Sequence, residues 1–180
     1  QQGLLRHYLF LAEGVELPML LYNVPSRTGM SFRAETYAAL AEHPNIYGVK
    51  EASGDLGLIL KTRALCPEDF ALYSGNDDQI VPILALGGLG VISTAANVVP
   101  AELHALCAGF FRGDLQEARA IQLRLQPLIE ALFLEVNPIP VKAALAAMGR
   151  VEEIVRMPLT TLGPAARHAL EQAMKGAALL

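Results

Sequence analysis

The sequence has no excess of basic residues, and this excludes two classes of partner. Fourteen Lys and Arg residues are outnumbered by eighteen Asp and Glu residues, which gives a formal net charge of −4. Nucleic acids and anionic membranes both attract proteins through clustered positive charge. We therefore expect neither nucleic acid nor membrane as a partner of this chain.

Cysteines and long apolar runs are also scarce. Cys66 and Cys107 are the only cysteines, and they match no metal-ligand spacing and make no disulfide framework. We therefore expect a reducing, cytoplasmic setting. The four histidines are scattered, so no metal site is expected. The longest apolar run, IVPILALGGLGVI (80–92), is too short and too rich in glycine to cross a bilayer, which takes about 20 residues.

Apolar runs alternate with helical patterns over the first two-thirds of the chain. With 53% hydrophobic residues in 180, the chain can fill a substantial core. Near-continuous apolar strands separated by helices are typical of βαβ units and a parallel sheet. The expected strands are 18–22, 45–50, 70–75 and 90–93, and the expected helices are 1–14, 32–43 with Ser31 as cap, 56–66, 80–88 and 100–111.

After about residue 113 the strand pattern stops. Asp114 and Glu117 resemble a capping box, and apolar residues then recur at helical spacing. Further helices are expected after NPIP (137–140) and from Gly163 onward. The sequence therefore predicts two domains, a parallel α/β region over 1–112 and an all-helical region over 113–180.

Each expected strand ends in polar residues. The four ends are Tyr22-Asn23, Lys50-Glu51, the segment 74–77 and Ser93-Thr94. In parallel α/β proteins chemistry collects at the carboxyl ends of the strands. Four polar strand ends in register therefore predict a site.

Lys50 is the most informative of these residues. Of the four lysines, it alone ends an apolar strand, where a cation is costly to bury without compensation. One interpretation is structural, with Lys50 in a rim ion pair with Glu51 or Asp55. The other is a nucleophilic amine that attacks a carbonyl and forms a Schiff base. Tyr22 favours the second, because neighbouring strand ends lie about 5 Å apart and a phenol can move the protons that this chemistry requires.

Two other motifs have simpler explanations. GNDDQ (75–79) could suggest a metal site, but we expect Asp77 and Asp78 to act as N-caps at the start of a helix. GGLG (87–90) lacks the spacing of a dinucleotide loop and precedes a strand rather than following one. Glycines here and at Gly75 would let the backbone approach a small ligand closely.

Taken in order, YNVPSRTG, GVKEASGDL, SGNDDQ, LGGLGVISTAANVVP and NPIPVKAAL resemble the successive motifs of the dihydrodipicolinate synthase family. This family belongs to the pyruvate-dependent class I aldolase/lyase superfamily, whose fold is a (β/α)8 TIM barrel. The resemblance implies condensation of pyruvate with L-aspartate 4-semialdehyde to 4-hydroxy-tetrahydrodipicolinate, a step of lysine and diaminopimelate biosynthesis. It implies no cofactor, because the imine itself serves as electron sink.

The resemblance also implies roles for five residues. Lys50 would form the Schiff base with pyruvate, and Tyr22 would donate and accept the protons. Ile92 would hold the pyruvate carboxylate through its main chain, and Gly75 would border the same pocket. Arg27 would bind the carboxylate of the aldehyde substrate, a task that suits a guanidinium.

The chain departs from the family at its front. The family's barrel has eight strands and takes about 250 residues, whereas this chain supplies about four βα units. We therefore expect the C-terminal half of the barrel followed by the helical region, a fragment that is inactive alone. The full-length protein is expected to be a homo-oligomer, a tetramer.

Two other interpretations remain open at this point. One is another lyase of the superfamily, of the sialic-acid lyase or keto-deoxy sugar aldolase type, which would keep Lys50 and Tyr22 and reassign Arg27. The other is a non-catalytic half-barrel that acts as an interaction module.

Overall fold

The computed structural model describes residues 1–180, which form two compact units, Gln1–Ile92 and Ser93–Leu180. The first unit carries all the strands, and the second contains helices alone. The two units divide at 92/93, which is 20 residues before the expected domain boundary at 112/113. The expected boundary concerns where the barrel ends, and it stays a prediction.

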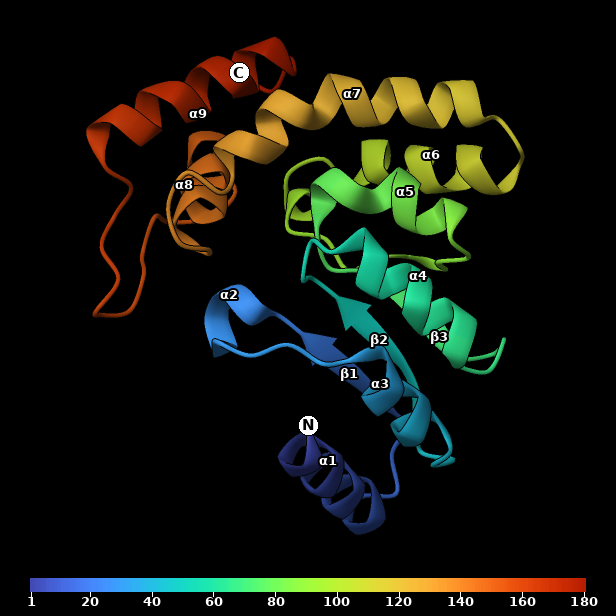
Figure 1. Ribbon diagram of the computed structural model, residues 1–180. Coiled ribbons are helices and arrows are strands. Elements are labelled where there is room, and N and C mark those ends of the chain that lie inside the picture. The colour runs from blue at the N-terminus through green and yellow to red at the C-terminus, as the bar shows by residue number, and fades with distance from the viewer. The chain divides into compact units, whose positions relative to one another are not determined.

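The first unit is built on a parallel four-stranded sheet in the order β1-β2-β3-β4 (Figure 1). Its strands are β1 (Met19–Asn23), β2 (Ile46–Glu51), β3 (Ala71–Ser74) and β4 (Gly90–Val91). Helices connect them, namely α1 (Gln2–Gly14), α2 (Pro25–Thr28), α3 (Ala34–Ala41), α4 (Leu56–Leu65), the short 3-10 helix η1 (Asp77–Gln79) and α5 (Ile80–Ala85). All four expected strands are present, although β4 is shorter than predicted.

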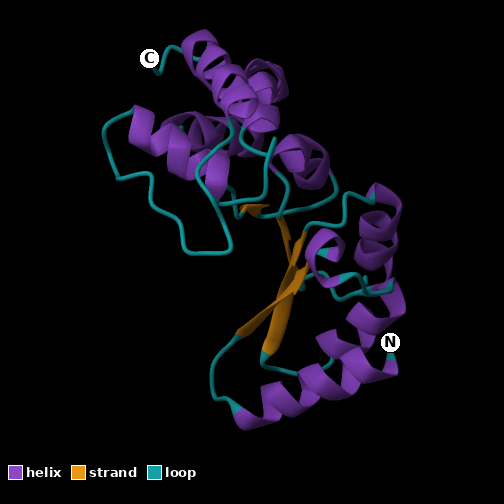
Figure 2. Cartoon of the chain, turned by 90° about the vertical axis from the view of Figure 1, so that its left-hand side faces the viewer, coloured by secondary structure: helices purple, strands orange, loops and turns teal.

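One face of this sheet packs against the helices of the same unit, which lie to one side of the strands in Figure 2. Leu21, Val49 and Leu72 are register partners and are 1%, 0% and 1% exposed. They share a core with Tyr37 of α3 and Ile59 of α4.

Helix α1 adds a second layer to this core. Ala12 is buried, and Leu4, Leu5, Tyr8 and Leu9 pack against the core from the same face of the helix.

Two expected helix caps are wrong. Helix α3 begins at Ala34, too late for Ser31 to cap it. The Gln1 side chain binds the N-terminal turn of α3 instead. Its Oε1 accepts hydrogen bonds from the Arg33 amide at 2.9 Å and from the Thr36 hydroxyl at 2.7 Å. Asp77 and Asp78 lie within η1, so neither is the cap of α5, whose N-cap residue is Gln79.

The second unit consists of η2 (Ala95–Asn97), α6 (Pro100–Phe111), α7 (Leu115–Ala131), α8 (Ile139–Ala147) and α9 (Pro164–Gly176). Helix α7 packs against α6 and α9, and α8 packs against α9. The Asp114 side chain accepts from the Glu117 amide at 3.0 Å, which confirms the predicted cap. The carboxylate of Glu117 pairs with Arg112 instead of reaching back, so half of the capping box forms.

Candidate active site

The strand register places Tyr22, Lys50 and Tyr73 side by side. Tyr22 is the register partner of Lys50, Lys50 of Tyr73, and Tyr73 of Gly90. Side chains alternate between the faces of a sheet along each strand, and register partners project from the same face. Because the preceding row faces the helices, this row projects from the opposite face, at the carboxyl ends of the strands.

Lys50 and Tyr22 are in contact on that face. The Lys50 Nζ lies 4.3 Å from the centroid of the Tyr22 ring, within the range of a cation–π interaction. Tyr22 is 41% exposed, so a ligand can reach the pair from this side. The amine and the phenol that the sequence singled out are thus brought together by strand register alone.

The competing interpretation of Lys50 as half of a rim ion pair is wrong. The ion pairs Arg112–Glu117, Arg124–Glu102 and Arg167–Glu153 do not include Lys50. Asp55 caps α4 by accepting from the Leu58 amide at 3.0 Å. Glu51 projects from the other face of the sheet and is 2% exposed. Lys50 is therefore not paired with either carboxylate.

Glu51 is instead the centre of a buried polar cluster. Its oxygens accept from the Asn23 amide group at 3.0 and 3.2 Å, from the Tyr37 hydroxyl at 2.8 Å and from the Ser53 main-chain amide at 2.7 Å. Burial, and next the Glu51 charge, raise the pKa of Tyr37 far above its ordinary value of 10.0. Tyr37 therefore keeps its proton and remains a donor.

Arg27 lies in the short helix α2. Pro25 occupies the first turn of α2, and Gly29 ends the helix in the left-handed conformation with φ of 68°. The Gly29 amide donates to the Pro25 carbonyl at 2.9 Å. Pro25 and Gly29 therefore shape this segment by starting and ending one helical turn. Arg27 is exposed on it.

Gly75 lies where no larger residue fits. Its amide donates to the Glu51 carbonyl at 2.7 Å, directly beyond the end of β3. A Cβ at this position would lie 2.7 Å from the Ala52 Cβ and 3.0 Å from the Glu51 carbonyl oxygen. The glycine thus lets the ends of β2 and β3 approach closely.

Ile92 follows β4 and is 41% exposed. Its amide donates to the Ser74 carbonyl at 2.9 Å, extending the ladder between β3 and β4. This N–H is therefore committed to the sheet, and a ligand carboxylate would have to bind other donors. The main-chain contact between Ile92 and pyruvate stays a prediction.

Sequence reasoning missed two parts of this region. Tyr73 shares the row of Lys50 and Tyr22, and the alternation of side chains along its strand could have found it. No sequence pattern indicates the hydrogen bond between Tyr37 and Glu51, because Tyr37 lies in a helix. The expected ion pair of Glu51 with Lys50 rested only on their being adjacent in the sequence. No group of three or more His, Cys, Asp and Glu residues could hold a metal ion, and none of the helices is long and apolar enough to span a membrane.

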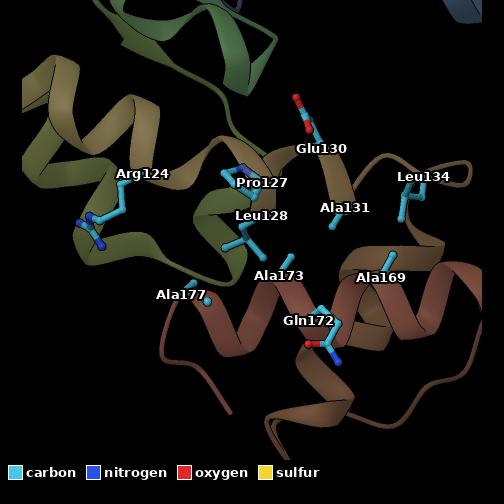
Figure 3. Close-up of a pocket in the computed structure, with 11 residues that line it drawn as sticks. Arg124, Pro127, Leu128, Glu130, Ala131, Leu134, Ala169, Gln172, Ala173 and Ala177 are labelled. Carbon is cyan, nitrogen blue, oxygen red and sulfur yellow. The ribbon is translucent and has the colours of Figure 1, made fainter.

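A separate pocket of about 540 Å³ lies between α7 and α9 in the second unit (Figure 3). Apolar residues such as Leu128, Ala131 and Ala173 line it. Its two charged residues are engaged elsewhere, Arg124 with Glu102 and Glu130 with Gln126. This pocket offers no pair of groups for catalysis.

Comparison with known proteins agrees with the geometry of the first unit. The sequence profile of the Dihydrodipicolinate synthetase family matches residues 1–177. The 4-hydroxy-tetrahydrodipicolinate synthase of Alkaliphilus oremlandii is 49% identical over 175 residues, which are 97% of this chain and 60% of that protein. The synthase of Methylococcus capsulatus is also 49% identical, over 100% of this chain and 62% of that protein.

Solved structures give the same result. Dihydrodipicolinate synthase from Thermotoga maritima matches with a TM-score of 0.97 and 42% identity, over 99% of this chain and 62% of that one. The Acinetobacter baumannii enzyme, solved in complex with pyruvate, matches with a TM-score of 0.95 and 40% identity over the same shares.

The chain spans about 60% of the length of the relatives that it matches. Its parallel four-stranded sheet with connecting helices matches half of the TIM-barrel fold of these enzymes. The match of the family profile across 1–177 and the identities near 49% have one explanation: the chain belongs to the dihydrodipicolinate synthetase family.

Proposed function

We propose that this chain carries the Schiff-base lysine and the proton-transferring tyrosine of a 4-hydroxy-tetrahydrodipicolinate synthase. The observation that supports this most is the position of the Lys50 Nζ, 4.3 Å from the centroid of the Tyr22 ring. The substrates would be pyruvate and L-aspartate 4-semialdehyde. Family membership supports the substrates, and the register of β1 and β2 supports the residue roles.

The reaction follows from these two groups. The uncharged Lys50 amine attacks the C2 carbonyl of pyruvate, and the carbinolamine loses water to form an imine. Loss of a proton from the methyl carbon gives an enamine, whose carbon attacks the aldehyde and forms the new carbon–carbon bond. The amino group of the second substrate then closes the ring at C2 and releases Lys50. The Tyr22 phenol can supply and remove the protons at each stage.

Three further residues would bind substrate. Arg27, exposed on α2, would hold the carboxylate of the aldehyde substrate through its planar guanidinium. Gly75 would border the pyruvate pocket, where its close approach to β2 leaves no room for a side chain. Ile92 would lie against pyruvate through its main chain. Its amide already donates to the Ser74 carbonyl, so holding the carboxylate there would require this bond to open or another donor to help.

We further propose that the four strands are the last four of the family's eight-stranded barrel. Residues 1–112 would then form the barrel portion and 113–180 the C-terminal helical region. The full-length protein would be a cytoplasmic homo-oligomer, a tetramer. The match to 62% of the solved synthase chains supports a partial barrel, and the run of helices without strands after residue 93 supports placing it before a C-terminal helical region.

A chimeric enzyme tests the proposal. The 180 residues replace the matching segment of the Methylococcus capsulatus synthase, to which they are 49% identical. The chimera and its Lys50→Arg variant are assayed for condensation of pyruvate with aspartate semialdehyde and with aldehydes of sugars. We expect aspartate semialdehyde to be preferred and Lys50→Arg to be inactive.

Each other outcome has a definite meaning. Preference for a sugar aldehyde would assign the chain to another lyase of the superfamily. A folded chimera that binds no pyruvate covalently would favour a non-catalytic module. The isolated chain is expected to show little or no turnover, so rapid turnover by it would contradict its reliance on further strands.

A further inference from the structure

The cluster around Glu51 lies on the opposite face of the sheet from Lys50 and Tyr22. Consecutive strand residues project from opposite faces, so Lys50 points to the site and Glu51 points toward the helices. Glu51 and Asn23 are each 2% exposed, and Tyr37 is 0% exposed. These groups cannot touch substrate, yet two of them directly follow the residues that we place in the reaction.

The partners of Glu51 come from three different segments. Asn23 ends β1, Tyr37 lies in α3, and Ser53 follows β2. All three donate to the carboxylate, which suits a group whose oxygens only accept. A buried carboxylate is costly unless several donors satisfy it, so displacement of any one segment carries a penalty. The cluster therefore fixes β1, β2 and α3 relative to one another.

Asn23 extends this fixation to the segment that carries Arg27. Its side-chain nitrogen also donates to the Ser31 hydroxyl at 3.1 Å, and its oxygen accepts from the Phe32 amide at 3.4 Å. Its carbonyl accepts from the Ala52 amide at 2.9 Å. Asn23 thus closes the base of the segment 24–30 and ties it to the end of β2.

We propose that Glu51 is a positioning residue of this site, which through Asn23 and Tyr37 holds Lys50, Tyr22 and the Arg27 segment in their reacting arrangement. The inference rests on the proposed function, since it assigns Glu51 a purpose in that reaction. Catalysis that depends on two side chains in contact is sensitive to small displacements, and a shift of 1 Å can cost about a hundredfold in rate.

The perturbation is Tyr37→Phe, with Glu51→Gln as a second variant. Tyr37→Phe keeps the ring that stacks on Phe32 at a centroid distance of 4.8 Å and removes the hydroxyl that binds Glu51. The matched control is Glu42→Gln, which changes an exposed carboxylate at the end of the same helix.

The first readout is made in the chimera described above, as the single-turnover rate of borohydride trapping of pyruvate on Lys50. We expect Tyr37→Phe to lower this rate and kcat by about tenfold or more, with KM for pyruvate nearly unchanged, because the loss affects the arrangement in the transition state. Glu51→Gln should act in the same direction, and Glu42→Gln should have no effect.

A purely structural role would give a different result. Tyr37→Phe would then lower the melting temperature while the trapping rate per folded molecule stayed at the parent value, and this outcome would overturn the proposal.

The second readout separates this inference from the proposed function. Hydrogen exchange is measured on the 180-residue chain, at the amides of Ala52 and Phe32, both of which donate to Asn23. Faster exchange in Tyr37→Phe supports the fixation even if the parent chimera traps no pyruvate, in which case the proposed function alone fails. Unchanged exchange at both amides would contradict the fixation itself.

Discussion

Replacement of Gly48, the single glycine of β2, should destabilise the sheet, because Gly48 lies against the backbone of the next strand. A Cβ at Gly48 would lie 2.2 Å from the carbonyl oxygen of Ala71 and 2.7 Å from its Cβ. A carbonyl in a strand cannot rotate away, so Gly48→Ala must push β2 and β3 apart. Overpacking of this kind costs about 1–3 kcal/mol, against a gain of about 0.4–1 kcal/mol from the stiffer unfolded chain. We expect a net loss of about 1 kcal/mol.

Urea unfolding followed by tyrosine fluorescence measures the stability of the first unit, which contains Gly48. The chain has no tryptophan, and its five tyrosines all lie within the first 92 residues. The control is Gly3→Ala in α1, where a Cβ would meet nothing within 4 Å. This variant should stabilise by up to about 1 kcal/mol through helix propensity. A Gly48→Ala protein as stable as the parent would refute the reasoning from close strand approach.

Three further predictions concern binding, capping and pH. In the chimera, Arg27→Lys should raise KM for aspartate semialdehyde about tenfold through loss of bidentate geometry, while pyruvate trapping stays unchanged; an equal loss in both assays would count against the assigned role. Asp114→Ala should lower the thermal stability of the second unit by about 1 kcal/mol, measured by circular dichroism. Because the pKa of Tyr37 is raised in the fold, its contribution to stability is present below about pH 10 and lost as pH rises. Urea titrations at increasing pH, with Tyr37→Phe as control, should show a larger loss in the parent, because the raised pKa values of the Cys66 and Cys107 thiols lower stability with rising pH in both proteins.

The strands of the fold could be predicted from the sequence because each is an apolar run between helical patterns. Apolar runs separated by helical patterns predicted all four strands of the parallel sheet. Helix starts were harder, because they depend on which side chain reaches the first turn. The N-terminal turn of α3 is bound by the side chain of Gln1, which lies 32 residues before Arg33 in the chain. No local pattern around Ser31 could reveal this partner.

The candidate site was predictable to the extent that it follows strand register. Tyr22 and Lys50 end neighbouring strands, and the structure brings them into contact. The partner of Glu51 was not predictable, since adjacency in sequence suggested Lys50 whereas alternation sends the two side chains to opposite faces. The position of the Tyr37 hydroxyl depends on how α3 packs on the sheet, which the sequence pattern does not specify.

The central claim is that Lys50 is the residue that bonds to pyruvate. The chimera is incubated with pyruvate and borohydride, digested, and mapped by mass spectrometry. We expect one modified position, Lys50, whose mass increases by the mass of pyruvic acid minus that of one oxygen atom. We also expect slower trapping in Tyr22→Phe. Modification of Lys61, Lys142 or Lys175 instead, or condensation with no trapped adduct on Lys50, would contradict the account.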